Sequence, residues 1–148
     1  MPFAETRLLT TVGAKIMMEA AISQAEKFGI AVTVVVVDAG GHTILLERMD
    51  GGRFHTVYSS TTKAVCAASN RRPTTTRGAQ AQELDTLHAL GLSLAAGPQR
   101  WTAIEGGFPI FIESQCVGGI GVSGGDWKQD EEIAHAAVEA VGANIGDA

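Results

Sequence analysis

Lys63 is the residue of this sequence best placed for chemistry. It stands in the stretch TTKAVCAAS, where its neighbours are small or apolar. A lysine in such surroundings is expected to be partly buried, and burial lowers the pKa of an ammonium group. A lysine of this kind can act as a base, as a nucleophile or as an anchor for an anion. The same stretch also suits a snorkelling lysine or a lysine held in an ion pair.

Glu105 and His55 are the groups that could work together with Lys63. Glu105 precedes two glycines and a proline in the stretch EGGFPI, where it is either an acid–base carboxylate, a partner of Lys63 or a solvated turn residue. His55 is the histidine nearest to the exit of the first predicted hairpin. We therefore predict Lys63, Glu105 and His55 as the catalytic candidates, with proton transfer as their chemistry.

The loops around these groups supply the expected ligand contacts. Residues 48–55 and 105–109 each flank a predicted strand, so we expect the two loops to lie close together with Lys63 between them. A strand end followed by a helix start suits a ligand carboxylate. Asp38 closes a hairpin turn, where its side chain can also cap the turn backbone. The predicted ligand-binding residues are Asp38, Arg48, Asp50, Gly106, Gly107 and Pro109.

The pattern of histidines and cysteines predicts no metal site. None of the four histidines (His42, His55, His88 and His135) stands four residues from another, which is the helical spacing of a zinc motif. Cys66 and Cys116 form neither a disulfide framework nor a CxxC motif. We expect both cysteines to be small core residues, since free cysteine is among the most buried residue types.

The stretch GGIGVSGGDW matches the GxGxxG pattern but stands in the wrong context for a dinucleotide site. Gly119 and Gly121 alternate with two aliphatic residues inside a predicted strand, and no βαβ unit surrounds them. Glycines at alternate positions remove the side chains from one face of a strand. We therefore expect a helix or a ligand to approach the backbone of this strand closely.

The apolar pattern places these residues on helices and two hairpins, which predicts an α+β fold with an antiparallel sheet. Predicted helices cover residues 7–28, residues 54–69, a stretch with a leucine stripe (Leu84, Leu87, Leu90 and Leu94) and a last stretch that begins after Asp126. The first predicted hairpin spans residues 31–37 and 42–49. The second ends in a strand over residues 116–122, and residues 101–104 are expected to add an edge strand.

Length and charge exclude several classes of protein. The 148 residues contain no linker or repeat, so we expect a single domain over residues 1–148. A formal net charge of -5 argues against a partner that is nucleic acid or an anionic membrane. No run approaches the roughly 20 apolar residues of a membrane helix. The start MPFAETRLL lacks the regions of a signal peptide, so we expect a cytoplasmic protein.

Three stretches, VVVVDAGGHTILLERMDG, TKAVCAASNRRPT and GGFPIFIESQCVGGIGVSGG, resemble the GlcG/HbpS family, which includes the C-terminal domain of PduO. The resemblance covers about residues 8–142. It implies a profilin-like fold with a five-stranded antiparallel sheet between helices, in three α/β/α layers. It also implies a homo-oligomer of up to eight copies and haem or cobalamin as cofactor. In the PduO-like branch a histidine of the first helix is associated with haem, whereas the first helix here carries Met17 and Met18.

Two functions remain open at this stage, and the sequence does not decide whether the protein is an enzyme. The first is a small-ligand-binding protein that holds haem, a corrinoid or a small anionic metabolite in a pocket at a subunit interface. The second is a cofactor-free catabolic enzyme that uses Lys63, Glu105 and His55 for acid–base chemistry on a small oxo- or hydroxy-acid. A structural or regulatory partner without a site of its own is a third interpretation.

Overall fold

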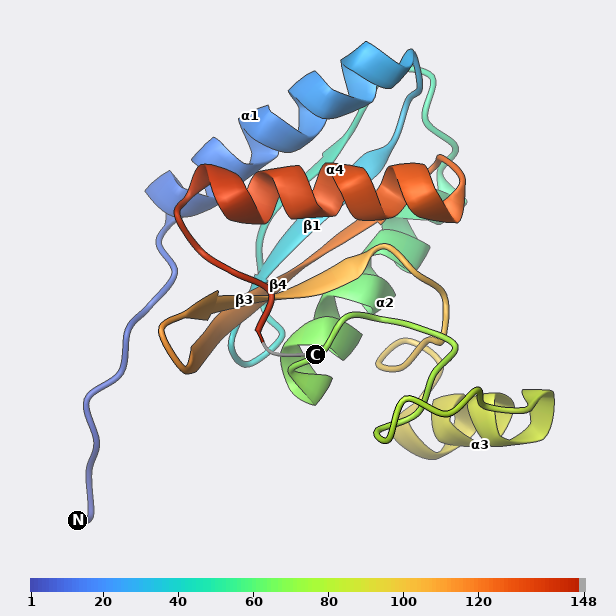
Figure 1. Ribbon diagram of the computed structural model, residues 1–148. Coiled ribbons are helices and arrows are strands. Elements are labelled where there is room, and N and C mark those ends of the chain that lie inside the picture. The colour runs from blue at the N-terminus through green and yellow to red at the C-terminus, as the bar shows by residue number, and fades with distance from the viewer. Residues whose placement is uncertain (147–148) are drawn as a thin grey trace.

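Within residues 1–146, which the computed structural model describes, four strands form one antiparallel sheet that helices cover on both faces (Figure 1). The elements are α1 (Thr11–Phe28), β1 (Thr33–Asp38), β2 (Thr43–Arg48), α2 (His55–Asn70), α3 (Thr86–Ala96), β3 (Gly107–Ile112), β4 (Gln115–Ser123) and α4 (Trp127–Ala140). The strand order is β2-β1-β4-β3. Helices α1 and α4 lie side by side on one face, and α2 lies on the other. The α+β prediction is confirmed.

The valine run of β1 explains why both faces of the sheet need a helical cover. Successive side chains of a strand point to opposite faces. Val34 and Val36 pack into the larger core, under α1 and α4, while Val35 and Val37 pack against Ala64 and its neighbours on α2. All four valines are fully buried. β1 is therefore an interior strand with apolar contacts on each side, as its uninterrupted β-branched sequence predicts.

The glycines of β3 and β4 allow the backbone of α2 to rest directly on the sheet. A Cβ atom at Gly121 would collide with the carbonyl oxygen of Ser60, and one at Gly119 with the carbonyl oxygen of Ala64. At Gly107 a Cβ atom would lie 2.5 Å from the carbonyl oxygen of Lys63. The object that approaches the glycine face is therefore a helix. This contact determines how close α2 lies to the sheet, and therefore how deeply the Lys63 side chain is buried.

The prediction of a fifth strand is wrong for the part of the chain that the structure describes. Residues 101–104 run as irregular chain instead of pairing with the sheet. Their backbone groups find side-chain partners: the carbonyl of Trp101 accepts from the Ser93 hydroxyl, and that of Thr102 accepts from the Cys66 thiol. A segment whose carbonyls are bonded to α2 and α3 has no need of a strand partner.

Two predicted boundaries also move. The first helix begins at Thr11 instead of residue 7, because the Thr10 side chain accepts a hydrogen bond from the backbone of Gly13 and caps the helix there. β3 begins at Gly107, so Gly107 and Pro109 belong to a strand and not to a loop. Pro109 pairs with Gly119 and is tolerated because β3 is an edge strand of the sheet.

Helix α3 projects away from the sheet and its helices (Figure 1). It has no buried residue, and its leucines Leu87, Leu90, Leu92 and Leu94 are all exposed. Leu87, Leu90 and Leu94 of the predicted leucine stripe therefore lie on a helix that packs against no other helix or strand within residues 1–146, while Leu84 precedes that helix. No helix in this part of the chain is long and apolar enough to cross a membrane.

We expect Gly121→Val to lower the free energy of unfolding by at least about 2 kcal/mol, since its methyl groups would enter the backbone of α2. Urea denaturation measures this change. Gly91→Ala in α3 is the matched control, because a Cβ atom there meets nothing within 4 Å. Equal stability of Gly121→Val and the wild type would show that α2 does not rest on β4.

Candidate functional site

A hollow of about 460 Å³ opens between α2, the chain that follows α3 and the end of β4. Its walls combine hydroxyl and charged groups with apolar surface. From α2 and the residues before it, the lining residues are Arg53, His55, Thr56, Ser59, Thr62 and Lys63. From α3 and the chain that follows it, they are Ser93, Pro98, Trp101, Thr102 and Ile104. The inner end is closed by Ser123, Gly124, Gly125 and Asp130. We call this cavity the α2 hollow.

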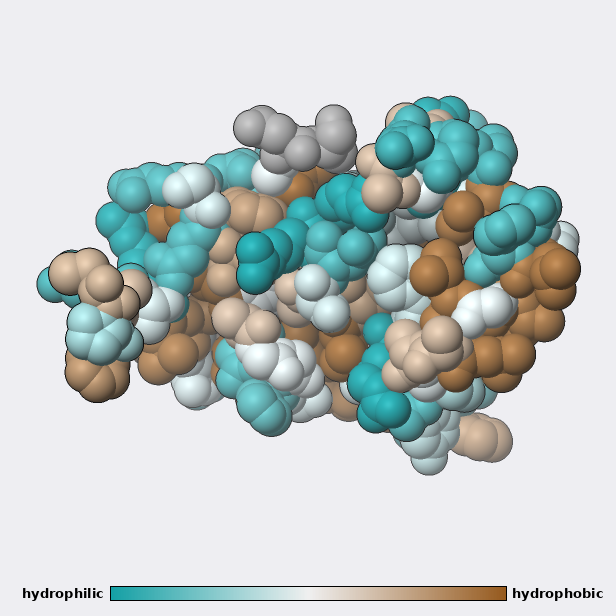
Figure 2. All heavy atoms as spheres, turned by 90° about the horizontal axis from the view of Figure 1, so that it is seen from below, coloured by the Kyte–Doolittle hydropathy of each residue, from teal (hydrophilic) through white to brown (hydrophobic). Residues whose placement is uncertain are grey.

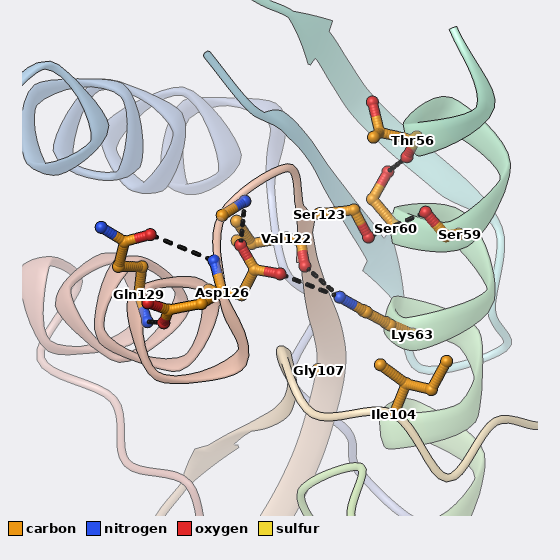
Figure 3. Close-up of polar contacts among 12 residues, drawn as sticks. Thr56, Ser59, Ser60, Lys63, Ile104, Gly107, Val122, Ser123, Asp126 and Gln129 are labelled. Atoms are coloured by element: carbon orange, nitrogen blue, oxygen red, sulfur yellow. Dashed lines mark hydrogen bonds and ion pairs between the residues drawn. The ribbon is translucent and has the colours of Figure 1, made fainter. Parts of the chain in front are cut away.

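Lys63 joins three elements at the inner end of the α2 hollow. Its ammonium group donates to the carbonyl of Val122 at 2.7 Å and to Oδ2 of Asp130 at 3.2 Å (Figure 3). The other carboxylate oxygen of Asp130 accepts from the backbone N–H of Gly125 at 2.9 Å. Lys63 and Asp130 are each only 4% exposed. The pair therefore connects α2 to the end of β4 and to the first turn of α4.

Burial is the main influence on the ionisation of this pair. Desolvation lowers the pKa of Lys63, and the charge of Asp130 opposes that shift. Desolvation likewise raises the pKa of Asp130, against the charge of Lys63. Two of the three N–H groups of the ammonium have acceptors, which makes Lys63 an anchored cation and not a free amine. The ion-pair interpretation of this lysine is the one that the geometry supports.

Glu105 lies close to Lys63 without a hydrogen bond to it. Its negative charge raises the pKa of Lys63, against the effect of burial. Burial raises the pKa of Glu131, and the charge of Glu105 adds to that shift. The next residue, Gly106, has φ +117° and would place a Cβ atom 2.9 Å from Nζ of Lys63. Only glycine fits between the ammonium and the turn. Asp130 is the carboxylate that lines the inner end of the hollow, whereas Glu105 acts on Lys63 through its charge and does not line the hollow.

The structure brings some of the predicted site residues together and separates others. His55 and Lys63 line the α2 hollow, and Gly106 and Gly107 pack against Lys63. Asp38 lies at the end of β1 that is far from Ser123 and the hollow. Its backbone pairs with Gly118, and its carboxylate accepts hydrogen bonds from the backbone N–H groups of Gly40 and His42.

Arg48, Asp50 and Pro109 do not line the hollow either. The Arg48 guanidinium donates to the carbonyl of Gly52, and Pro109 is buried within β3. The loop over residues 48–55 therefore contributes its far end, Arg53 and His55, and not its first residues.

Of the residues that line the hollow, only His55 and Lys63 are among the predicted site residues. Arg53, Ser59, Ser123 and Asp130 have ordinary local contexts, and only the packing of α2 on the sheet assembles them. Asp130 has a second explanation from the sequence, because an acidic residue in the first turn of a helix suits the helix dipole. Ser59 donates to Ser123 at 2.9 Å, which is a contact across 64 residues that no local pattern shows.

Metal ligands are scarce in the described chain. Residues 1–146 contain no group of three or more histidine, cysteine, aspartate or glutamate side chains arranged to hold a metal ion. His42, His88 and His135 each bond a carboxylate close by in the sequence. His55 has no hydrogen-bond partner for its ring within residues 1–146, and it lines the hollow. It is therefore the imidazole in this region that a ligand can reach.

The layered sheet with a cavity beside α2 defines a small α+β ligand-binding protein. Comparison with known sequences agrees: the pattern of the HbpS-like family, described as haem-degrading protein HbpS-like, matches residues 9–139. The chain belongs to this family. The protein GlcG of Escherichia coli K12 is 32% identical over 116 residues, which cover 78% of this chain and 81% of GlcG.

Solved structures agree with the sequence comparison. The complex of PduOC with haem superposes with a TM-score of 0.84 at 25% identity and covers 95% of this chain and 100% of that one. A double mutant of HbpS from Streptomyces reticuli superposes with a TM-score of 0.77 at 31% identity, over 93% and 90% of the two chains. The family thus includes a protein whose structure was solved with haem.

We expect Lys63→Met to lower the free energy of unfolding by about 3–5 kcal/mol, because it leaves the Asp130 carboxylate buried without its cation. The double variant Lys63→Met/Asp130→Asn should recover part of this loss. Thermal or urea denaturation measures both. Lys15→Met on the exposed side of α1 is the control and should change stability by less than about 0.5 kcal/mol. Full additivity of the two single variants would argue against a coupled pair.

Proposed function

We propose that this protein binds an anionic small molecule in the α2 hollow. The observation that carries the proposal is the pair of side chains at its mouth, Arg53 and His55. Neither takes part in an ion pair with any residue of the described chain, although the protein has a net charge of -5. Arginine binds carboxylates through two parallel N–H groups, and an exposed guanidinium beside a cavity is well suited to that contact.

Haem is the first ligand to test, because its iron suits an imidazole such as His55 and its propionates suit a guanidinium such as Arg53. A relative was solved as a haem complex. Here His55 would hold the iron, and Arg53 would face a propionate. Phe54 and Tyr58 flank His55 in the sequence and are 77% and 72% exposed, which offers apolar surface to a planar ring. Bound haem would supply an iron centre for redox or ligand-exchange chemistry.

The first helix fits haem less well than the α2 hollow does. Met17 is fully buried in the core, so its sulfur cannot reach a ligand. Met18 is 4% exposed and lies at a separate groove between α1 and β2, whose rim carries Glu19, Glu26 and Glu47. Three carboxylates beside a single lysine would repel propionates. A corrinoid or a smaller carboxylate metabolite would use the same cations at the α2 hollow.

The exposed leucines of α3 support the proposal that the protein is a homo-oligomer. Figure 2 shows apolar side chains gathered at the end of the molecule where α3 lies. Ile104, which lines the hollow, is 61% exposed and continues this surface toward the mouth. A contiguous apolar surface of this kind marks an interface between proteins. A second copy that covers α3 would place the α2 hollow beside the subunit interface.

We expect haem added to the purified protein to give a Soret band that saturates at one haem per chain. His55→Ala should weaken haem binding at least about tenfold and shift the band, since the variant lacks the proposed iron ligand. His88→Ala on α3 is the matched control and should bind haem like the wild type. Absorption titration of all three proteins makes the measurement. Identical titrations of His55→Ala and the wild type would exclude His55 as the ligand.

We expect light scattering after size exclusion to show an oligomer at micromolar concentration. Leu90→Glu should shift the distribution toward the monomer, because a buried unpaired charge would oppose the contact through α3. Glu26→Gln on α1 serves as the control. A wild-type protein that runs as a monomer would contradict the proposal.

A further inference from the structure

We propose that the inner end of the α2 hollow recognises a neutral oxygen of the ligand, and that the preferred small ligands are monocarboxylates with a hydroxyl or carbonyl oxygen near the acid group. This inference rests on the proposed anion site at Arg53 and His55. It names the chemical class of ligand that would extend from that site to the inner end of the hollow. The inner end of the hollow holds hydrogen-bond donors that are available to a ligand oxygen.

The first such donor is the third N–H of Lys63. An ammonium group carries three donors. Two of them are accounted for by the carbonyl of Val122 and the carboxylate of Asp130, and residues 1–146 provide no acceptor for the third. Lys63 is 4% exposed, yet it lines the hollow. Because a buried donor without an acceptor costs free energy, an oxygen atom supplied by a ligand would be stabilising here.

The second donor is the hydroxyl of Ser123. This oxygen accepts from Ser59 at 2.9 Å, and in that arrangement the Ser123 proton has no other acceptor within residues 1–146 and is available to a ligand oxygen. Ser123 is also 4% exposed and lines the hollow. The carbonyl that Lys63 contacts belongs to the peptide bond between Val122 and Ser123. Both donors therefore lie in the same space between β4 and α2 (Figure 3).

The charges around these donors decide which kind of ligand oxygen would bind to them. Asp130 is within hydrogen-bond distance of Lys63, and Glu105 acts on it through its charge. A second carboxylate of a ligand would meet these two negative groups with one cation that is already paired. A neutral hydroxyl or carbonyl oxygen accepts from Lys63 and Ser123 without that repulsion. The carboxylate of the ligand would stay at the mouth, with Arg53.

The apolar part of the wall favours ligands with a hydrophobic body. Pro98, Trp101 and Ile104 supply this apolar lining, and the buried indole N–H of Trp101 has no hydrogen-bond partner within residues 1–146. A hollow of about 460 Å³ also exceeds the volume of the smallest oxo- and hydroxy-acids. Aromatic acids with a 2-hydroxyl group therefore combine the three features: a carboxylate, a neutral oxygen and an apolar ring.

Three probes test this inference: 3-phenyllactate, 3-phenylpropanoate and phenylsuccinate. The first two are monoanions that differ by one hydroxyl group, and the third is phenylpropanoate with a second carboxylate on the carbon that bears the ring. We expect the wild type to bind phenyllactate about tenfold more tightly than phenylpropanoate, since the extra oxygen gains hydrogen bonds to buried donors. Phenylsuccinate should bind no better than phenylpropanoate. Calorimetry or ligand-observed NMR measures the affinities.

Ser123→Ala should bring the affinity for phenyllactate close to that for phenylpropanoate, while phenylpropanoate itself is unaffected. Ser114→Ala, on the exposed turn between β3 and β4, is the matched control and should keep the tenfold preference. Equal affinity of the wild type for phenyllactate and phenylpropanoate would overturn the inference but leave the carboxylate site standing. If no probe binds, or if Arg53→Gln binds all three like the wild type, the proposed anion site itself is wrong.

Discussion

The contact of α2 with the glycines of β3 and β4 is the constraint on which the rest of the structure depends. A helix normally stands about 10 Å from a sheet, because side chains separate the two backbones. Here the carbonyls of Ser60, Lys63 and Ala64 occupy the positions that Cβ atoms of the strands would take. Because α2 lies so close to the sheet, the Lys63 side chain reaches the end of β4. There its ammonium group donates to the carbonyl of Val122 and to the carboxylate of Asp130.

The buried ion pair follows from that depth and explains the arrangement around it. A lysine placed so close to the sheet needs an acceptor, and Asp130 provides one from the first turn of α4. Asp130 also binds the backbone of Gly125, which fixes the turn between β4 and α4. One pair of charges thus sets the inner wall of the α2 hollow. Arg53 and His55, which take part in no ion pair within residues 1–146, line the same hollow, and the proposed anion site rests on them.

Much of the fold follows from local physical chemistry. The valine run of β1, the caps at Thr10 and Asp126 and the alternating glycines of β4 each act over a few residues. The sequence analysis used them to predict the interior strand, the start of the last helix after Asp126 and a strand that a neighbour approaches closely, whereas the cap at Thr10 corrects the predicted start of the first helix. The resemblance to the GlcG/HbpS family added the layered topology, and the structure shows these layers with a four-stranded sheet. The expected fifth strand is not formed within residues 1–146, because strand pairing depends on partners that the local pattern does not reveal.

The site is the part that the sequence determined least. Lys63 and His55 stand out by their residue type and neighbours, and both line the hollow. The sequence could not tell that Lys63 is neutralised by Asp130, 67 residues away, or that Ser59 meets Ser123. It also could not place Asp38 at the far end of β1 from Lys63. Composition and periodicity determine which elements form, whereas the partners of a buried charge depend on how closely those elements pack, and only the tertiary structure decides that.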